Sequence, residues 1–270
     1  MNSNHFHKTR IAPTPSGYLH LGNAYSFLLT QSIAQKTDAK ILLRIDDLDE
    51  ERTRALYIQD IFDTLEFLEI QYDEGPRDYG EYKKEYSQLL RGPLYETALQ
   101  QLADRGLVYG CNCSRAQLET EACNCSTKNI PLNKPDMAWR LFTDNTKEII
   151  VHAFEKGIIK ATLPPEMKDF IVRKKDGRPS YQLASLVDDV HYQIDLIIRG
   201  EDLWASTLAQ LFLAEKLGFG PFLNVCFIHH PLLKNSSGEK LSKSAGAETV
   251  KGLGIQNLKN QVNEYLAHLP

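Results

Sequence analysis

A histidine and two small residues lie where a helix begins near the start of the chain. The β-like residues 9–13 are followed by Ser16-Gly17 and then by an apolar helical pattern, with His20 and Gly22 at its beginning. The start of a helix offers unpaired N–H groups and the positive end of its dipole, and both favour a phosphate. Gly22 would let a nucleotide approach the backbone. Alone, such a turn is more often structural than functional.

Two lysines near the other end of the chain have the spacing to hold an anionic group between them. Lys240 and Lys243 flank Ser242 in a loop rich in serine, lysine and glycine. Two ammonium groups so placed could close on a triphosphate and stabilise the charge that grows when a phosphorus atom is attacked. A solvated surface loop is the alternative when the segment is taken alone.

Four cysteines form two Cys-x-Cys pairs within fifteen residues: Cys111, Cys113, Cys123 and Cys125. Four thiolates suffice for a tetrahedral zinc site of the structural kind, which leaves no position open for catalysis. The single-residue gaps are shorter than in most zinc motifs, so a disulfide or free thiols remain alternatives.

The elements that must position these residues alternate between strand and helix. Strands are expected at residues 9–13, 40–45, 193–198 and 222–228, and helices at 21–33, 56–68, 82–106, 203–217 and 255–269. This alternation predicts an α/β fold with a parallel sheet. The proline-punctuated middle of the chain, residues 75–190, is expected to form an insertion between the two halves of the sheet, and residues 235–247 a mobile loop.

Composition limits the classes of protein that fit. The 270 residues, 42% of them hydrophobic, can bury one large core or two smaller ones. A formal net charge of −4 argues against a protein that coats nucleic acid nonspecifically. The sequence has neither an uninterrupted apolar run of roughly 18 residues nor a signal-like start, so a cytoplasmic protein without a membrane partner is expected.

Taken together, the histidine and lysine segments resemble the paired ATP-binding signatures of class I aminoacyl-tRNA synthetases. Four further stretches follow the glutamyl-tRNA synthetase subfamily in order: residues 10–20, 43–47, 181–184 and 198–203. The resemblance extends over residues 10–244 and implies a Rossmann-like parallel sheet with an inserted zinc-containing α+β subdomain that binds the acceptor.

The resemblance also implies roles for individual residues. The residues implied to hold the amino acid are Arg10, Ala12, Thr14, Asp46, Tyr181 and Arg199; those implied to hold ATP are His20, Gly22, Asn23, Lys240, Ser242 and Lys243, with His20, Lys240 and Lys243 acting in catalysis. Guanidinium groups can hold the carboxylates of a glutamate-like ligand in bidentate fashion. Asp46 stands where the family commonly has glutamate, which leaves the amino acid less certain than the reaction.

Only 26 residues follow Ser244, too few for the anticodon-binding region of a full-length glutamyl-tRNA synthetase. This layout resembles the glutamyl-Q tRNA(Asp) synthetases, which are free-standing catalytic domains. The expected organisation is a catalytic domain in two halves (1–74 and 191–247), an acceptor-binding subdomain with the zinc site (75–190), a closing helix (248–270) and no anticodon-binding domain.

The resemblance implies that a monomer activates glutamate with Mg²⁺ and ATP, without needing tRNA, and transfers it to the queuosine base of tRNA(Asp). The alternatives are a ligase for another acceptor and a catalytically silent, zinc-stabilised RNA-binding module.

Two neighbouring acids, Asp188 and Asp189, either orient the substrate-binding residues or are ordinary turn acids.

Overall fold

The computed structural model describes residues 5–233 and 255–269. The expected loop at residues 235–247, with Lys240, Ser242 and Lys243, lies outside the described residues. No helix in the described ranges is long and apolar enough to cross a lipid bilayer.

The strands form three sheets, and the two parallel ones lie side by side. The strands are β1 (Lys8–Ile11), β2 (Lys40–Leu43), β3 (Val108–Cys111), β4 (Ala138–Leu141), β5 (Ile149–Ala153), β6 (Gly157–Ala161), β7 (Ile171–Arg173), β8 (Leu196–Gly200) and β9 (Cys226–His230). β1 pairs with β2 in parallel, and β8 and β5 both pair with β9 in parallel. β6 adds an antiparallel edge. The Asp195 N–H donates to Lys8 O, so β1 lies next to β8.

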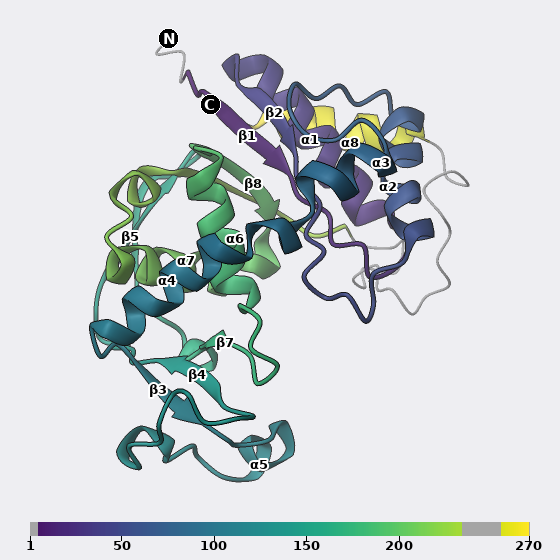
Figure 1. The fold of residues 1–270 in the computed structure, drawn as a ribbon. Helices are drawn as coiled ribbons and strands as arrows, with labels where there is room; N and C mark the ends of the chain where they lie inside the picture. The colour runs from purple at the N-terminus through teal and green to yellow at the C-terminus, as the bar shows by residue number, and fades with distance from the viewer. Residues whose placement is uncertain (1–4, 234–254, 270) are drawn as a thin grey trace.

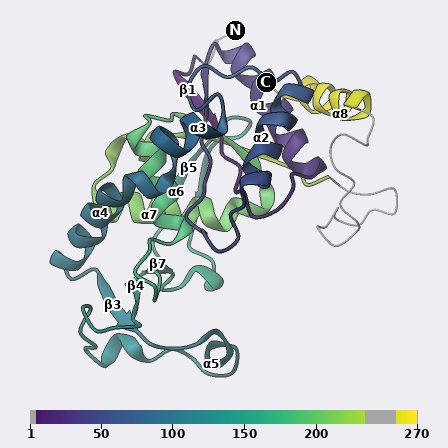
Figure 2. The ribbon, with the colours of Figure 1, turned by 45° about the vertical axis from the view of Figure 1, so that its right-hand side comes forward.

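Helices cover both faces of these sheets. They are α1 (Leu21–Thr37), α2 (Ala55–Phe67), α3 (Tyr79–Glu81), α4 (Gly92–Asp104), α5 (Arg115–Thr120), α6 (Tyr181–His191), α7 (Trp204–Leu217) and α8 (Ile255–Ala267). In Figure 1, α1, α2, α3 and α8 flank β1 and β2, while α4, α6 and α7 lie across the middle of the molecule. The antiparallel strands β3, β4 and β7 form, with α5, a separate lobe below. Figure 2 shows this lobe projecting away from the parallel sheets.

β8 divides two hydrophobic cores. Leu196 and Ile198 pack into the core beside α1, α2 and α8, whereas Ile197 packs into the core formed with α4, α6 and α7. Because successive side chains of a strand point to opposite faces, a strand buried on both faces must be apolar throughout, as the run Leu196–Ile198 is. The predicted α/β fold with a parallel sheet is confirmed.

Two expected elements differ from the structure. The helix expected at residues 82–106 is broken: Ser87 is extended, with ψ 139°, and α4 begins only at Gly92, where Pro93 can sit because a first-turn residue needs no N–H partner. The strand expected from residue 222 begins at Cys226, because residues 220–224 form a 3₁₀ turn that includes Pro221.

The middle of the chain contributes to both the lobe and the main sheet. β5 lies within the expected insertion at residues 75–190 and pairs with β9 of the second half. Its partner β6 is also in that range. These pairings do not test the domain boundaries expected from the sequence, which stay a prediction.

Candidate active site and metal site

A buried network of charges joins the ends of β1, β2 and α6. Arg44 follows β2, and its guanidinium holds both carboxylate oxygens of Asp46, at 2.7 and 3.0 Å. The same group donates to Asp189 Oδ1 at 2.7 Å, and Arg10 Nε donates to that oxygen at 3.1 Å. All four side chains are at most 8% exposed. The structure thus brings together two residues expected to bind the amino acid, Arg10 and Asp46.

The network shifts the acidity of its members. Burial raises the pKa of Asp46, although Arg44 works in the opposite direction. Burial alone would lower the pKa of Arg44, but the carboxylates of Asp46, Asp189 and Asp188 raise it well above its ordinary value. Arg44 therefore stays charged and fixes the carboxylates around it.

Asp188 anchors α6 to residues just before and within α4. It accepts two hydrogen bonds from Arg91, at 2.7 and 3.0 Å, one from the Tyr95 hydroxyl at 2.7 Å and one from Gln88 Nε2 at 2.8 Å. Asp188 and Asp189 are both fully buried on α6. They are thus not turn acids, and they hold the helix that carries Tyr181 against the charge network.

Arg199, in β8, is a buried cation, and within residues 5–233 and 255–269 its hydrogen bonds go to neutral groups. Its Nη1 donates to Gln210 Oε1 at 2.9 Å and to Thr207 Oγ1 at 3.3 Å, both on α7. In the part of the chain that the structure describes, its Nε and Nη2 have no hydrogen-bond partner, and the side chain is only 3% exposed. Burial and the positive charge of Arg10 lower the pKa of Arg199 to about 10. A buried guanidinium in this state is suited to receive an anion.

The remaining residues expected to bind the amino acid lie around this network. Tyr181 is the first residue of α6, follows the N-cap Ser180 and is 44% exposed. Ala12 and Thr14 follow β1 in the segment that runs beside the end of β2, where the Asp46 N–H donates to Pro13 O at 2.9 Å. Their contacts with a substrate stay a prediction.

The three expected ATP-binding residues that the structure describes form the beginning of α1. His20 is the N-cap: its Nδ1 accepts from the Gly22 N–H at 3.1 Å, and its own N–H donates to Asn23 Oδ1 at 3.1 Å. A Cβ on Gly22 would lie 3.0 Å from His20 Cε1, so glycine leaves room for the ring. From the sequence, Gly22 is expected to let a nucleotide approach the backbone. The structure adds a second reason for glycine at this position, which is the space that the His20 ring occupies.

The four cysteines of the lower lobe meet in one cluster. Cys111 ends β3, Cys125 begins a 3₁₀ turn, and all four Sγ atoms lie within 4.8 Å of one another. The Sγ separations are 3.5 Å for Cys113–Cys125, 3.7 Å for Cys111–Cys123 and 3.9 Å for Cys113–Cys123. Sulfurs bound to zinc at about 2.3 Å form a tetrahedron with edges of about 3.8 Å, so the cluster can hold a metal ion.

The surroundings of the cluster shift the acidity of its thiols in different directions. Burial and hydrogen bonds with neighbouring sulfurs raise the pKa of Cys113 to about 12, and burial raises the pKa of Cys123. Burial raises the pKa of the Cys111 thiol, but the Cys113 N–H and the Arg140 guanidinium lower it to about 7 overall. All four side chains are free cysteines rather than disulfide partners. Because a bound metal ion itself deprotonates its thiol ligands, four free cysteines at these separations can act as donors to a thiophilic metal ion.

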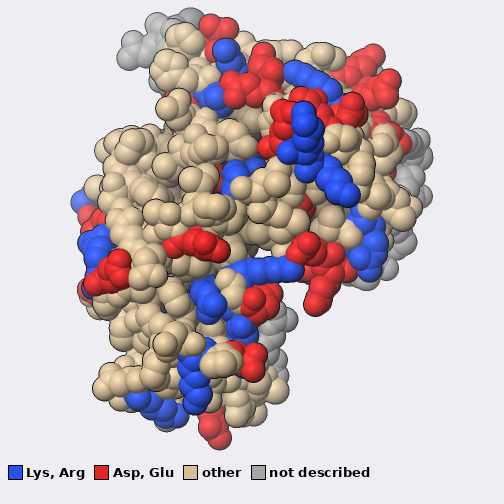
Figure 3. Space-filling view, viewed as in Figure 1, with Lys and Arg blue, Asp and Glu red and all other residues tan. Residues whose placement is uncertain are grey.

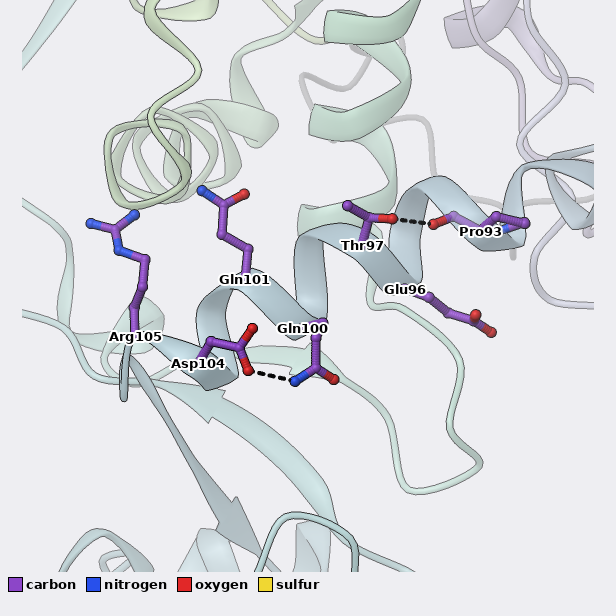
Figure 4. A pocket seen from close by; sticks show the side chains of 7 residues that line it. All are labelled: Pro93, Glu96, Thr97, Gln100, Gln101, Asp104 and Arg105. Atoms are coloured by element: carbon purple, nitrogen blue, oxygen red, sulfur yellow. Dashed lines mark hydrogen bonds between the residues drawn. The ribbon is translucent and has the colours of Figure 1, made fainter.

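Two surface hollows lie away from the charge network. One, of about 620 Å³, follows α4, and Figure 4 shows the hydrogen bonds from Gln100 to Asp104 and from Thr97 to the Pro93 carbonyl in its lining. The other, of about 320 Å³, lies beside Tyr109 and Phe142 in the lower lobe. Neither is lined by an expected site residue. In Figure 3, lysine and arginine side chains gather along the indentation between that lobe and the rest of the molecule.

Sequence reasoning missed several buried polar residues. Two of them had a signal in the sequence. Arg44 stands between the apolar residues Leu43 and Ile45, and Gln210 is a glutamine within an apolar helix. Such residues are costly to bury without partners, so they are candidates for a polar site. No sequence signal indicated which partners Arg91 and Tyr95 would find.

Comparisons with known proteins agree with this arrangement. The family model for tRNA synthetases class I (E and Q), catalytic domain, matches residues 7–150 and 135–260. A glutamyl-Q tRNA(Asp) synthetase of Nitratidesulfovibrio vulgaris is 34% identical over 90% of this chain and 80% of its own length. A glutamate–tRNA ligase 2 of Syntrophus aciditrophicus is 33% identical over 90% of this chain and 53% of its own.

A solved structure shows the same fold. The glutamate tRNA ligase of Elizabethkingia meningosepticum, in complex with its amino acid, superposes with a TM-score of 0.75 and 25% identity over 90% of this chain and 53% of that chain. The chain thus spans about half the length of the glutamate–tRNA ligases it matches.

The fold and the matching family model define the catalytic domain of a class I aminoacyl-tRNA synthetase, a ligase. The chain belongs to the family of class I tRNA synthetases for glutamate and glutamine, whose relatives include the glutamyl-Q tRNA(Asp) synthetases and the glutamate–tRNA ligases.

Proposed function

We propose that the protein activates glutamate with ATP to glutamyl adenylate and transfers the glutamyl group to a tRNA, onto the queuosine base of tRNA(Asp). The relative that matches over 80% of its own length carries that name. The protein would act in the cytoplasm, as a monomer, on ATP, glutamate and tRNA.

The observation that carries the proposal is the state of Arg199. Its charge has only neutral hydrogen-bond partners, and its Nε and Nη2 are buried without a partner among the described residues. Glutamate brings two carboxylates, and Arg10, whose charge lowers the pKa of Arg199, is a second buried guanidinium nearby. Arginine binds a carboxylate through two parallel hydrogen bonds, so a ligand with two carboxylates suits this site.

In the reaction proposed, a carboxylate oxygen of glutamate attacks the α-phosphorus of ATP in line, and pyrophosphate leaves. Arg10, Arg199, Asp46 and Tyr181 would position the amino acid, and the beginning of α1 at His20 would face the phosphates. Lys240 and Lys243 would stabilise the charge on the phosphates, as their spacing in the sequence predicts. ATP would enter as its magnesium complex.

We further propose that the cysteine cluster holds a structural zinc ion. The separations of the sulfurs fit a tetrahedral thiolate site, and all four donors come from one lobe. Zinc with four sulfur ligands supplies folding energy rather than an open coordination position. Its role would be to shape the lobe that binds the acceptor, whose indented side carries the lysines and arginines seen in Figure 3.

Transfer of labelled glutamate to three RNAs tests the acceptor: tRNA(Asp) with queuosine, the same tRNA with guanine at that position, and the queuosine-bearing tRNA without its 3′-terminal adenosine. The proposal expects glutamate on the first and third RNAs and none on the second. Transfer to the first and second but not the third would identify a 3′-end ligase. Transfer to none of them, without adenylate formation, would indicate a silent RNA-binding module.

A further inference from the structure

Gln210 is fully buried on α7 and contacts the cation on which the proposed function depends. Its Oε1 accepts from Arg199 Nη1 at 2.9 Å. The second Nη1 hydrogen goes to Thr207 Oγ1, which in turn lies 2.8 Å from His229 Nε2. One nitrogen of the guanidinium is thus held from α7, while Nε and Nη2 are buried and have no hydrogen-bond partner in the described part of the chain.

These two unpartnered nitrogens form the edge of the guanidinium that a carboxylate can accept from. A guanidinium presents Nε–H and one Nη2–H side by side, and a carboxylate can accept both in parallel. Holding Nη1 from α7 fixes the direction in which that edge points. Gln210 therefore acts on the orientation of Arg199 as well as on its solvation.

Glutamine at this position is not the choice that would stabilise the fold most. The Gln210 Nε2 group is buried and has no acceptor among the residues described, and the charge of Arg199 has no carboxylate hydrogen-bonded to it. An isosteric glutamate would remove the unsatisfied donor and compensate the buried charge. A neutral amide keeps the arginine in place without neutralising it.

We propose that Gln210 is a positioning residue that determines specificity: its neutral amide orients Arg199 and leaves the positive charge of that residue available to a carboxylate of the substrate. This inference rests on the proposed function for the identity of the substrate. The uncompensated charge of Arg199 destabilises the protein without ligand, and a bound carboxylate removes this effect. Glutamate should therefore stabilise the protein strongly.

The test is Gln210→Glu, compared with Gln101→Glu as a control for added charge. Gln101 lies on α4, where its Nε2 donates to Leu217 O, away from Arg199. In Gln210→Glu the new carboxylate pairs with Arg199 and competes with the substrate. The thermal midpoint without ligand is expected to rise, and the KM for glutamate in pyrophosphate exchange to rise about 10- to 100-fold. Gln101→Glu is expected to leave that KM unchanged.

A second variant separates orientation from charge. Gln210→Met keeps the volume but removes the acceptor, so the KM for glutamate is expected to rise several-fold with a smaller change in kcat. A lower thermal midpoint for Gln210→Glu without ligand would overturn the inference, whether or not the protein has activity. An unchanged KM in both Gln210 variants would also overturn it. Absence of glutamate-dependent exchange in the unmodified protein would instead refute the proposed function, while the thermal midpoint would still decide the role of Gln210.

Discussion

Arg44 holds both carboxylate oxygens of Asp46 at hydrogen-bonding distance, although the two residues are separated by a single position in the chain. Both are buried, and the second half of the guanidinium reaches Asp189 on α6. Asp46 is thereby fixed by the fold before any substrate arrives. Its side chain is thus part of a structural ion pair.

This pair predicts a large loss of stability for Asp46→Asn. Removing the charge leaves a buried guanidinium partly uncompensated, which typically costs roughly 3 kcal/mol of unfolding free energy. Urea unfolding measures the change. The control is Asp49→Asn, which breaks the exposed pair with Arg52 and should cost less than about 1 kcal/mol. Equal effects of the two variants would contradict the structural role of Asp46.

The cysteine cluster predicts one zinc ion per chain in the purified protein. Elemental analysis should find it, and Cys125→Ser should lower both the zinc content and the thermal midpoint, because a structural zinc ion stabilises only the folded state. Cys226→Ser, which changes a cysteine outside the cluster, should keep the metal. A folded protein with full thermal stability and no metal would show that the cluster consists of free thiols.

His229 predicts a dependence of stability on pH. Burial, with the nearby charge of Arg199, lowers the pKa of His229 from 6.5 to about 4. Between these values the unfolded chain carries a proton on this ring that the folded protein does not. Stability from the neutral ring is therefore complete above pH 6.5 and is lost as the pH falls toward 4. Unfolding at several pH values should show a shallower decline for His229→Gln than for the unmodified protein. Parallel profiles would refute the assignment.

Lys243, outside the described residues, is predicted from its sequence position to act on the phosphates. Lys243→Ala should lower the rate of adenylate formation by about 100-fold, with less than about a threefold change in the KM for glutamate. Lys259→Ala, on the surface of α8, is the matched control and should change neither. Equal losses in rate and in glutamate binding would contradict the role of Lys243.

The regular part of the fold could be predicted from local patterns. Strands and helices at residues 40–45, 56–68 and 203–217 follow from continuous or periodic apolar runs, and the end of α7 from Gly218, which takes a left-handed conformation with φ 73°. A break in the expected helix 82–106 had a signal in Pro93, which favours the first turn of a helix. Its position at Ser87 could not be predicted, because the Ser87 hydroxyl and the next N–H both donate to the distant Asp47.

Only part of the candidate site could be predicted from the sequence. Residues such as Arg10 and Arg199 could be found because their types and order match a family. The partners that fix them could not, because Asp189 on α6 meets Arg10, and Gln210 on α7 meets Arg199, only once these helices have packed against the sheet. Sequence spacing has no information on such contacts without the fold.

Pyrophosphate exchange into ATP, measured with the pure protein and no tRNA, tests the central claim most directly. Glutamate, aspartate and glutamine would be compared at equal concentration. Because the charge of Arg199 is left for a carboxylate, we predict exchange with glutamate well above that with glutamine, whose side-chain amide is neutral. Exchange with glutamine as fast as with glutamate, or no exchange with any of the three even after tRNA is added, would contradict the account.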